Sequence, residues 1–285
     1  MQIGRVFATS FAMLRQRFWK LAGMWAVFFA IQIAGSIALG VGIVMMSLSG
    51  MESLEGLEDT TAIAGMGIGM LAMVVLFYGA YLVLVLAQQA AMVTLASPLE
   101  EPAFGPAMAR GFRSALPFFV VAVLATAAYV ALAVAVETAT GGSESGESSA
   151  AGTVIGLVLL PVAIYLACRF SVLVPVVAVD QVYNPLAALR RSWVLTRGKV
   201  LSILLAMIAL TALMAVGLGL PFVLVFSALP DGGQGAVASE GVVLLGVLLI
   251  VLLFILVTIF AAAFNAALHS EVTGGGAEAL EEVFA

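Results

Sequence analysis

Residues 21–48 read LAGMWAVFFAIQIAGSIALGVGIVMMSL and contain no charged side chain. A bilayer core of ~30 Å is crossed by about 20 helical residues, so this run is long enough to span a membrane. Five further apolar runs follow it along the chain. The six predicted spans are residues 21–48, 63–95, 117–136, 153–179, 200–229 and 242–268. They predict an all-α polytopic membrane protein with six transmembrane helices in three hairpins.

The composition agrees with a bilayer as the surrounding solvent. Of the 285 residues, 64% are hydrophobic and 9% are charged, which is too little polar surface for a water-soluble domain of this size. The single cysteine, Cys168, excludes an internal disulfide framework and a multi-cysteine metal site. We expect it to be a small packing residue. The first apolar run is too long for a cleaved signal peptide, so we expect an uncleaved first span.

Lys and Arg residues lie in alternate gaps between the spans. All of them except Arg169 lie there: Arg5, Arg15, Arg17 and Lys20; Arg110 and Arg113; Arg190, Arg191, Arg197 and Lys199. In the other gaps every charged residue is acidic. The positive-inside rule therefore predicts a multi-pass protein of the bacterial inner membrane with both termini in the cytoplasm. Splitting residues 60–99 into two spans would put the last basic gap outside, so we expect one long span there.

The three basic gaps resemble one another. Each places an aromatic residue, Phe11, Phe112 or Trp193, a few positions before a membrane span. Apolar residues at helical spacing beside Arg and Lys are typical of a short amphipathic helix lying in the membrane interface. We therefore expect one integral membrane domain in which each hairpin is preceded by such a helix. The repeat units would be residues 1–100, 101–180 and 181–270, followed by an acidic tail, 271–285. Alternatively, any cytoplasmic loop would carry basic residues and an aromatic anchor.

Two segments of the third unit are distinctive: residues 169–175, RFSVLVP, and 184–199, NPLAALRRSWVLTRGK. They resemble the membrane domain associated with glycerophosphoryl diester phosphodiesterases and related uncharacterised six-span bacterial inner-membrane proteins. In that group an Arg and a Pro close the fourth span, as Arg169 and Pro175 do here. Asp180 matches an acidic residue that often follows. These 285 residues contain no soluble catalytic domain, so the resemblance implies a membrane module and not phosphodiesterase activity.

Polar residues within the returning spans are candidate ligand contacts. Arg169 follows a long uncharged run, and Gln88, Gln89 and Asn265 lie at similar depths in the other returning spans. If the units repeat, these residues would converge on a polar cavity near the inner leaflet. The alternative is that Arg169 snorkels to the headgroups, helped by a bend at Pro175, and that the others make separate interhelical hydrogen bonds.

The third basic gap adds further candidates. On an interfacial helix, Arg and Lys meet anionic headgroups at roughly 1 kcal/mol per charge. The candidate lipid- or ligand-binding residues are Arg169, Gln88, Gln89, Asn265, Arg190, Arg191, Trp193, Arg197 and Lys199. Asn184 and Pro185 would open the helix, and Gly198 would allow the turn into the fifth span. The alternative is that these residues are topology anchors only.

Catalysis has little support in the sequence. His269 is the single histidine, and we expect it to be an interfacial polar residue at a span end with no Asp or Cys nearby. A catalytic triad or zinc site would need such partners. We therefore expect no enzyme activity, no cofactor, no metal and no nucleic-acid partner.

Three functions remain to be weighed. We favour a non-enzymatic inner-membrane module that organises lipid or a partner protein. The alternative is a transporter or channel for a small or lipidic solute, favoured by glycine-rich spans and Arg169, but lacking the membrane-embedded acids usual in transporters. A lipid enzyme is third, since the chain has one histidine and no paired carboxylates.

Overall fold

The computed structural model describes residues 1–54, 60–99, 103–140, 150–227 and 240–274. Within these ranges the chain is mostly helical and contains no β-strand, which confirms the all-α fold class. The helices are α1 (Ile3–Leu54), α2 (Thr60–Ala96), α3 (Phe104–Thr140), α4 (Ala150–Phe170), α5 (Leu173–Ala178), α6 (Pro185–Leu195), α7 (Val200–Ser227) and α8 (Glu240–Val272). The predicted acidic loops and most of the tail lie outside the described residues.

Six segments of the described ranges are long and apolar enough to cross a membrane. They are Ile3–Met45, Met73–Ala96, Phe104–Val136, Leu157–Ala178, Val200–Val223 and Leu244–Val272. The chain is therefore a multi-pass membrane protein. The prediction of one long span across residues 63–95 is confirmed, because α2 is a single helix.

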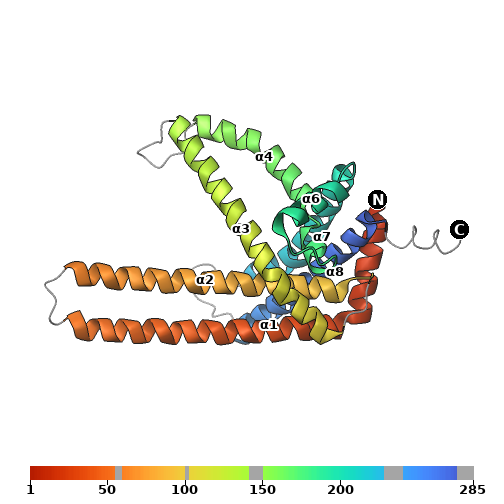
Figure 1. Cartoon of the computed structure of the whole chain (residues 1–285). Helices are drawn as coiled ribbons and strands as arrows, with labels where there is room; N and C mark the ends of the chain where they lie inside the picture. Colours follow the sequence, from red (N-terminus) through yellow and green to blue (C-terminus); the bar gives the residue numbers. More distant parts are fainter. Residues whose placement is uncertain (55–59, 100–102, 141–149, 228–239, 275–285) are drawn as a thin grey trace, which may run out of the picture.

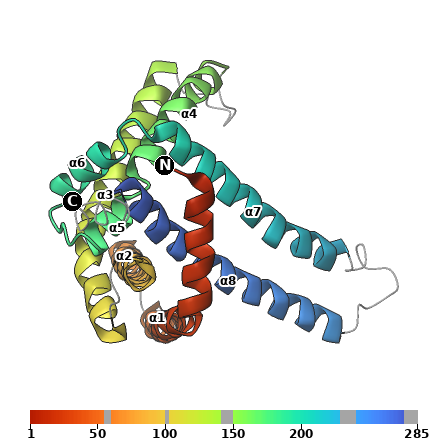
Figure 2. The same ribbon diagram turned by 90° about the vertical axis from the view of Figure 1, so that its right-hand side faces the viewer.

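The helices form three hairpins that leave a common base in different directions. Figure 1 shows α1 and α2 side by side, while α3 and α4 open as a V. Figure 2 shows that α7 and α8 leave the base along a third direction. The three hairpins thus diverge from one another and do not form a parallel bundle.

Buried side chains concentrate at this base, which we call the hub. The hub comprises two adjoining clusters within residues 6–28, 87–96, 107–118, 168–188, 203–210 and 259–272. Many of its members on α2 and α8 are alanines, which let helix backbones approach closely. Farther out, the hairpins expose large apolar side chains such as Tyr129 and Leu245. Lipid tails can cover such side chains, so the hairpins do not need to bury them within the protein.

The fourth predicted span, residues 153–179, is interrupted. Helix α4 ends at Phe170 and the short α5 begins at Leu173. Pro175 explains the break, because its ring has no N–H and clashes with the carbonyl of the residue four positions earlier, Ser171. The segment Leu157–Ala178 is still long and apolar enough to cross a membrane, and the break agrees with the bend expected near Pro175. Arg169 lies in the last turn of α4.

The short helices expected before the spans are not all separate elements. Only α6 is distinct from the span that follows it, whereas α1 and α3 run continuously from their basic segments into their spans. In Figure 2 the first part of α1 nevertheless turns away from the rest of that helix, which is seen end-on. We call residues 3–20, 104–116 and 185–199 the leading segments.

Each leading segment packs against the returning helix of a different hairpin. At the start of α1, the ring of Phe11 lies 4.8 Å from that of Phe260 on α8. At the start of α3, a Cβ on Gly111 would lie 2.6 Å from a backbone oxygen of α2. On α6, the hydroxyl of Ser192 donates to the carbonyl of Arg169 on α4 at 2.7 Å. These three contacts close a cycle around the hub.

Candidate functional site around helix α6

Asn184 and Pro185 form the start of α6, as predicted. The Oδ1 atom of Asn184 accepts hydrogen bonds from the backbone N–H groups of Leu186 at 3.0 Å and Ala187 at 3.3 Å. Pro185 occupies the first helical turn, where its missing N–H would have had no helical partner. At the other end, Gly198 has a φ of +76°, which confirms that this position needs glycine for the turn into α7.

Arg169 points into the protein and joins α4 to α6. Its side chain donates from Nε at 2.9 Å and from Nη2 at 2.7 Å to the hydroxyl of Tyr165, and from Nη1 at 3.1 Å to the carbonyl of Trp193. The guanidinium carbon also lies 4.6 Å from the ring centroid of Trp193. Only 8% of Arg169 is exposed. Its partners are therefore Tyr165 and Trp193, and not Gln88, Gln89 or Asn265, toward which a shared polar cavity would have drawn it.

The backbone of Arg169 contributes to the same joint. Helix α4 ends one residue later, so the Arg169 carbonyl has no helical N–H to accept from. The hydroxyl of Ser192 donates to this carbonyl at 2.7 Å, and that of Thr196 donates to it at 3.4 Å. Arg169 therefore donates to α6 through its side chain and accepts from the α6–α7 segment through its backbone.

The expected polar cavity is corrected by these contacts. Gln88 does not meet Arg169; its Oε1 accepts from Nε2 of Gln32 on α1 at 2.8 Å. Gln89 and Asn265 are half-buried on α2 and α8. Arg169 and Gln88 therefore make separate contacts, because the divergent hairpins do not bring them to one point.

Asp180 lies between α5 and α6 and contacts two basic groups. Its Oδ2 accepts from Nε of Arg191 at 2.7 Å, and its Oδ1 lies 3.4 Å from Nε2 of His269 on α8. Burial by itself would raise the pKa of the Asp180 carboxyl, but the contacts with His269 and Arg191 outweigh it and hold this pKa below its usual range. The expectation of an interfacial histidine without a nearby acid is wrong: His269 is 1% exposed and faces Asp180.

Two basic residues of the leading segments bind helix ends. Arg17 donates from Nη1 to the carbonyls of Leu95 at 3.0 Å and Ser97 at 2.9 Å, at the end of α2. Lys199 donates from Nζ to the carbonyl of Val272, the last residue of α8, at 2.7 Å. These carbonyls have no partner within their helices, and the negative end of each helix dipole favours a cation. Arg17 thus lies before the first span and caps α2, the returning helix of that hairpin. Lys199 lies before α7 and caps α8 in the same way.

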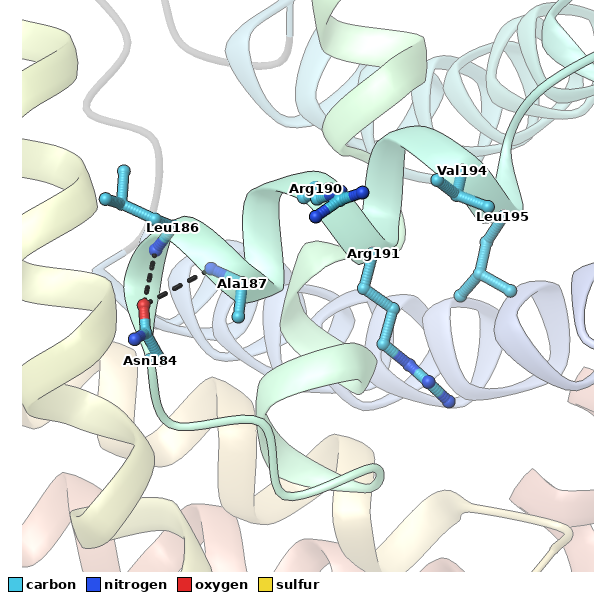
Figure 3. Close-up of a pocket in the computed structure, with 7 residues that line it drawn as sticks. All are labelled: Asn184, Leu186, Ala187, Arg190, Arg191, Val194 and Leu195. Carbon is cyan, nitrogen blue, oxygen red and sulfur yellow. Dashed lines mark hydrogen bonds between the residues drawn. The ribbon is translucent and has the colours of Figure 1, made fainter.

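The remaining candidates lie on the outer side of α6. Figure 3 shows a shallow depression along this helix, lined by Asn184, Leu186, Ala187, Arg190, Arg191, Val194 and Leu195. Leu186, Arg190 and Val194 are four residues apart and exposed, so they form one outer face. In Figure 3 the side chain of Arg191 leaves the helix in a different direction from that of Arg190.

The structure thus divides the Lys and Arg residues other than Arg110 into two groups. The first group binds groups within the protein: Arg5, Arg17, Arg169, Arg191 and Lys199. The second group has no hydrogen bond or ion pair with any described residue. Its members are Arg15, Lys20, Arg113, Arg190 and Arg197. All five members of the second group are exposed. The sequence alone did not distinguish the two groups.

Several of these contacts were not predicted from the sequence. Tyr165 precedes Arg169 by one helical turn, so its spacing was a usable signal. The roles of Gln32 and Arg17, and the pairing of Asp180 with His269, had no local signal, because each depends on how distant helices meet. Within the described ranges, no group of three or more His, Cys, Asp or Glu residues is placed to hold a metal ion.

Comparisons with known proteins found no family model, no curated protein and no solved structure that matches this chain. The resemblance to the phosphodiesterase-associated membrane domain stays a prediction that rests on residues 169–199.

Proposed function

We propose that this protein is a non-enzymatic module of the bacterial inner membrane that organises lipid or a partner protein. One observation carries the proposal: α4 exposes apolar side chains on all of its sides. The exposed residues include Val154, Leu157, Val158, Leu160, Val162, Ile164 and Leu166. Successive positions of a helix point about 100° apart, so these residues surround it. The part of α4 that precedes its buried last turn therefore has its surface available to lipid or to a helix of another protein.

The polar residues favour this proposal over a transporter or channel. Arg169 and Gln88 are each engaged by a neighbouring helix, and neither contributes to a shared polar path with the other. The transporter remains the alternative to test, because Gln32 and Gln88 form a polar pair within a predicted membrane hairpin.

The proposed orientation places both termini in the cytoplasm. The backbone N–H of Gln2 donates to Oε1 of Glu271 at 2.8 Å, and Nη1 of Arg5 lies 3.7 Å from Oε2 of the same residue. This contact supports placing the start of α1 and the end of α8 on the same side of the membrane, which agrees with an even number of spans. The cyclic packing of the leading segments supports the proposed threefold internal repeat.

The proposal is tested by isolating the protein from its native membrane in a lipid-preserving polymer. We expect the isolated particles to be enriched in one lipid class relative to the bulk membrane, or to contain a second protein at fixed stoichiometry. Bulk lipid composition with no second protein would overturn the proposal. Ion conductance or solute flux in reconstituted vesicles would favour the transporter instead.

A further inference from the structure

Helix α6 is fixed by one side and leaves the other side uncovered. Ala188 and Ser192 are fully buried against the hub. Arg169 holds the carbonyl of Trp193, and Asp180 holds Arg191. With these contacts in place, rotation of α6 about its axis would break several hydrogen bonds at once.

The uncovered side combines one cation with two apolar residues. Leu186 is 70% exposed and Val194 is 62% exposed, and exposed Arg190 lies between them at helical spacing. No described residue offers the Arg190 guanidinium a hydrogen bond or an ion pair. Its five donors are therefore available to an external group.

The position of α6 along the chain fixes where this side lies. Only residues 196–199 separate α6 from α7, one of the segments able to cross the membrane. Gly198 makes the turn between the two helices. Under the proposed topology, in which α7 crosses the membrane, α6 lies beside the cytoplasmic end of α7, at the level of lipid headgroups.

We propose that the outer side of α6 is a phospholipid-binding site, in which Arg190 binds the phosphate of an anionic lipid. Leu186 and Val194 contact the upper acyl chains of the same lipid. This inference rests on the proposed function and names the ligand class and the residues. The planar guanidinium matches two phosphate oxygens at once, and an anionic headgroup complements its charge.

Arg191 provides a matched contrast, since it is the next residue and carries the same charge. Its Nε is engaged by Asp180 at 2.7 Å, so its role is to position α6. The proposal therefore requires that two adjacent arginines have different roles, which nonspecific attraction to a charged surface does not require.

The test uses the full-length protein in a neutral detergent, titrated with phosphatidylglycerol or phosphatidylcholine and followed by native mass spectrometry. We expect the wild type to bind phosphatidylglycerol more tightly. Arg190→Gln should weaken this binding about fivefold, the equivalent of about 1 kcal/mol per charge. Arg191→Gln should change lipid binding less than twofold but lower the unfolding temperature, whereas Arg190→Gln should leave that temperature unchanged.

Inorganic phosphate is the competing ligand in a second titration. We expect no displacement of phosphatidylglycerol by millimolar phosphate, because the acyl contacts at Leu186 and Val194 add to the binding. Displacement would overturn the lipid as the ligand of this site. Equal losses in Arg190→Gln and Arg191→Gln, or no loss in Arg190→Gln, would overturn the site while leaving a lipid-enriched wild type consistent with the proposed function.

Discussion

The Nε2 atom of His269 lies 3.4 Å from Oδ1 of Asp180, so the last turn of α8 is tied to the turn that precedes α6. The distance is that of an ion pair, while the alignment falls short of a hydrogen bond. The other carboxylate oxygen holds Arg191. One carboxylate thus links α8 to α6 at the edge of the hub.

Asp180→Asn should destabilise the protein by about 1–2 kcal/mol at neutral pH, since it removes the charge from both contacts and Arg191 is half exposed and screened. The pKa of Asp180 is lowered in the folded state, so the unfolded chain takes up the proton first as pH falls. The contribution of the Asp180 charge to the stability of the fold is present well above the unfolded pKa of about 3.9. It is lost as pH falls through the folded pKa. Unfolding temperatures of both proteins should therefore converge below about pH 4. A difference that stays constant down to pH 3 would contradict this account.

Arg169→Leu should lower stability by about 2–4 kcal/mol, because the Trp193 carbonyl loses one of its donors and the stacked guanidinium is removed. Arg169→Lys should restore only part of the loss, since an ammonium group lacks the planar fork. Buried Cys168 is the single thiol, so its labelling by a thiol-reactive dye on heating reports unfolding. Unchanged stability in Arg169→Leu would show that the residue merely tolerates its site.

Gly111→Ala should force α3 away from α2, because the added Cβ would lie 2.6 Å from a backbone oxygen of Ala87 and 2.7 Å from Cβ of Ala91. We expect a loss of about 1–3 kcal/mol by the same dye measurement. Gly105→Ala in the same helix is the control, as its Cβ would meet nothing within 4 Å. It should be neutral or stabilising by up to about 1 kcal/mol, because alanine favours helix. Similar losses in the two variants would argue against close packing at Gly111.

Arg17→Gln should expose the end of α2, since it removes the donor to the carbonyls of Leu95 and Ser97. We expect a loss of about 1–3 kcal/mol. Lys20→Gln removes an equal charge from the same segment at an exposed position and should stay within about 0.5 kcal/mol of wild type. Equal losses of stability in the two variants would show that stability depends on the net charge of this segment and not on capping of α2.

The charge pattern predicts the sidedness of the chain. Reporter fusions at Glu55, Glu144 and Gly233 should read periplasmic, while fusions at Gly105, Gly198 and the C-terminus should read cytoplasmic. A cytoplasmic signal at Glu144 would rule out this arrangement of six spans.

Hydropathy and charge were sufficient to predict the number of spans and their grouping into hairpins. Local rules also predicted the Asn184–Pro185 start of α6 and the turn at Gly198. The direction of each hairpin was not predictable, because apolar side chains that face lipid and those that face protein look alike in sequence. The same limit hid the contacts of Arg169 with Trp193 and of His269 with Asp180, since each joins segments whose relative path the sequence does not specify.

The contact between the first turns of α1 and the last turns of α8 has a consequence for biogenesis. Phe7 and Phe11 leave the ribosome long before the rings that they contact, Phe264 and Phe260, are made. Until α8 is made, these aromatic residues of α1 lack their partners. A chain truncated before α8 would therefore expose more of this aromatic surface than the whole chain does.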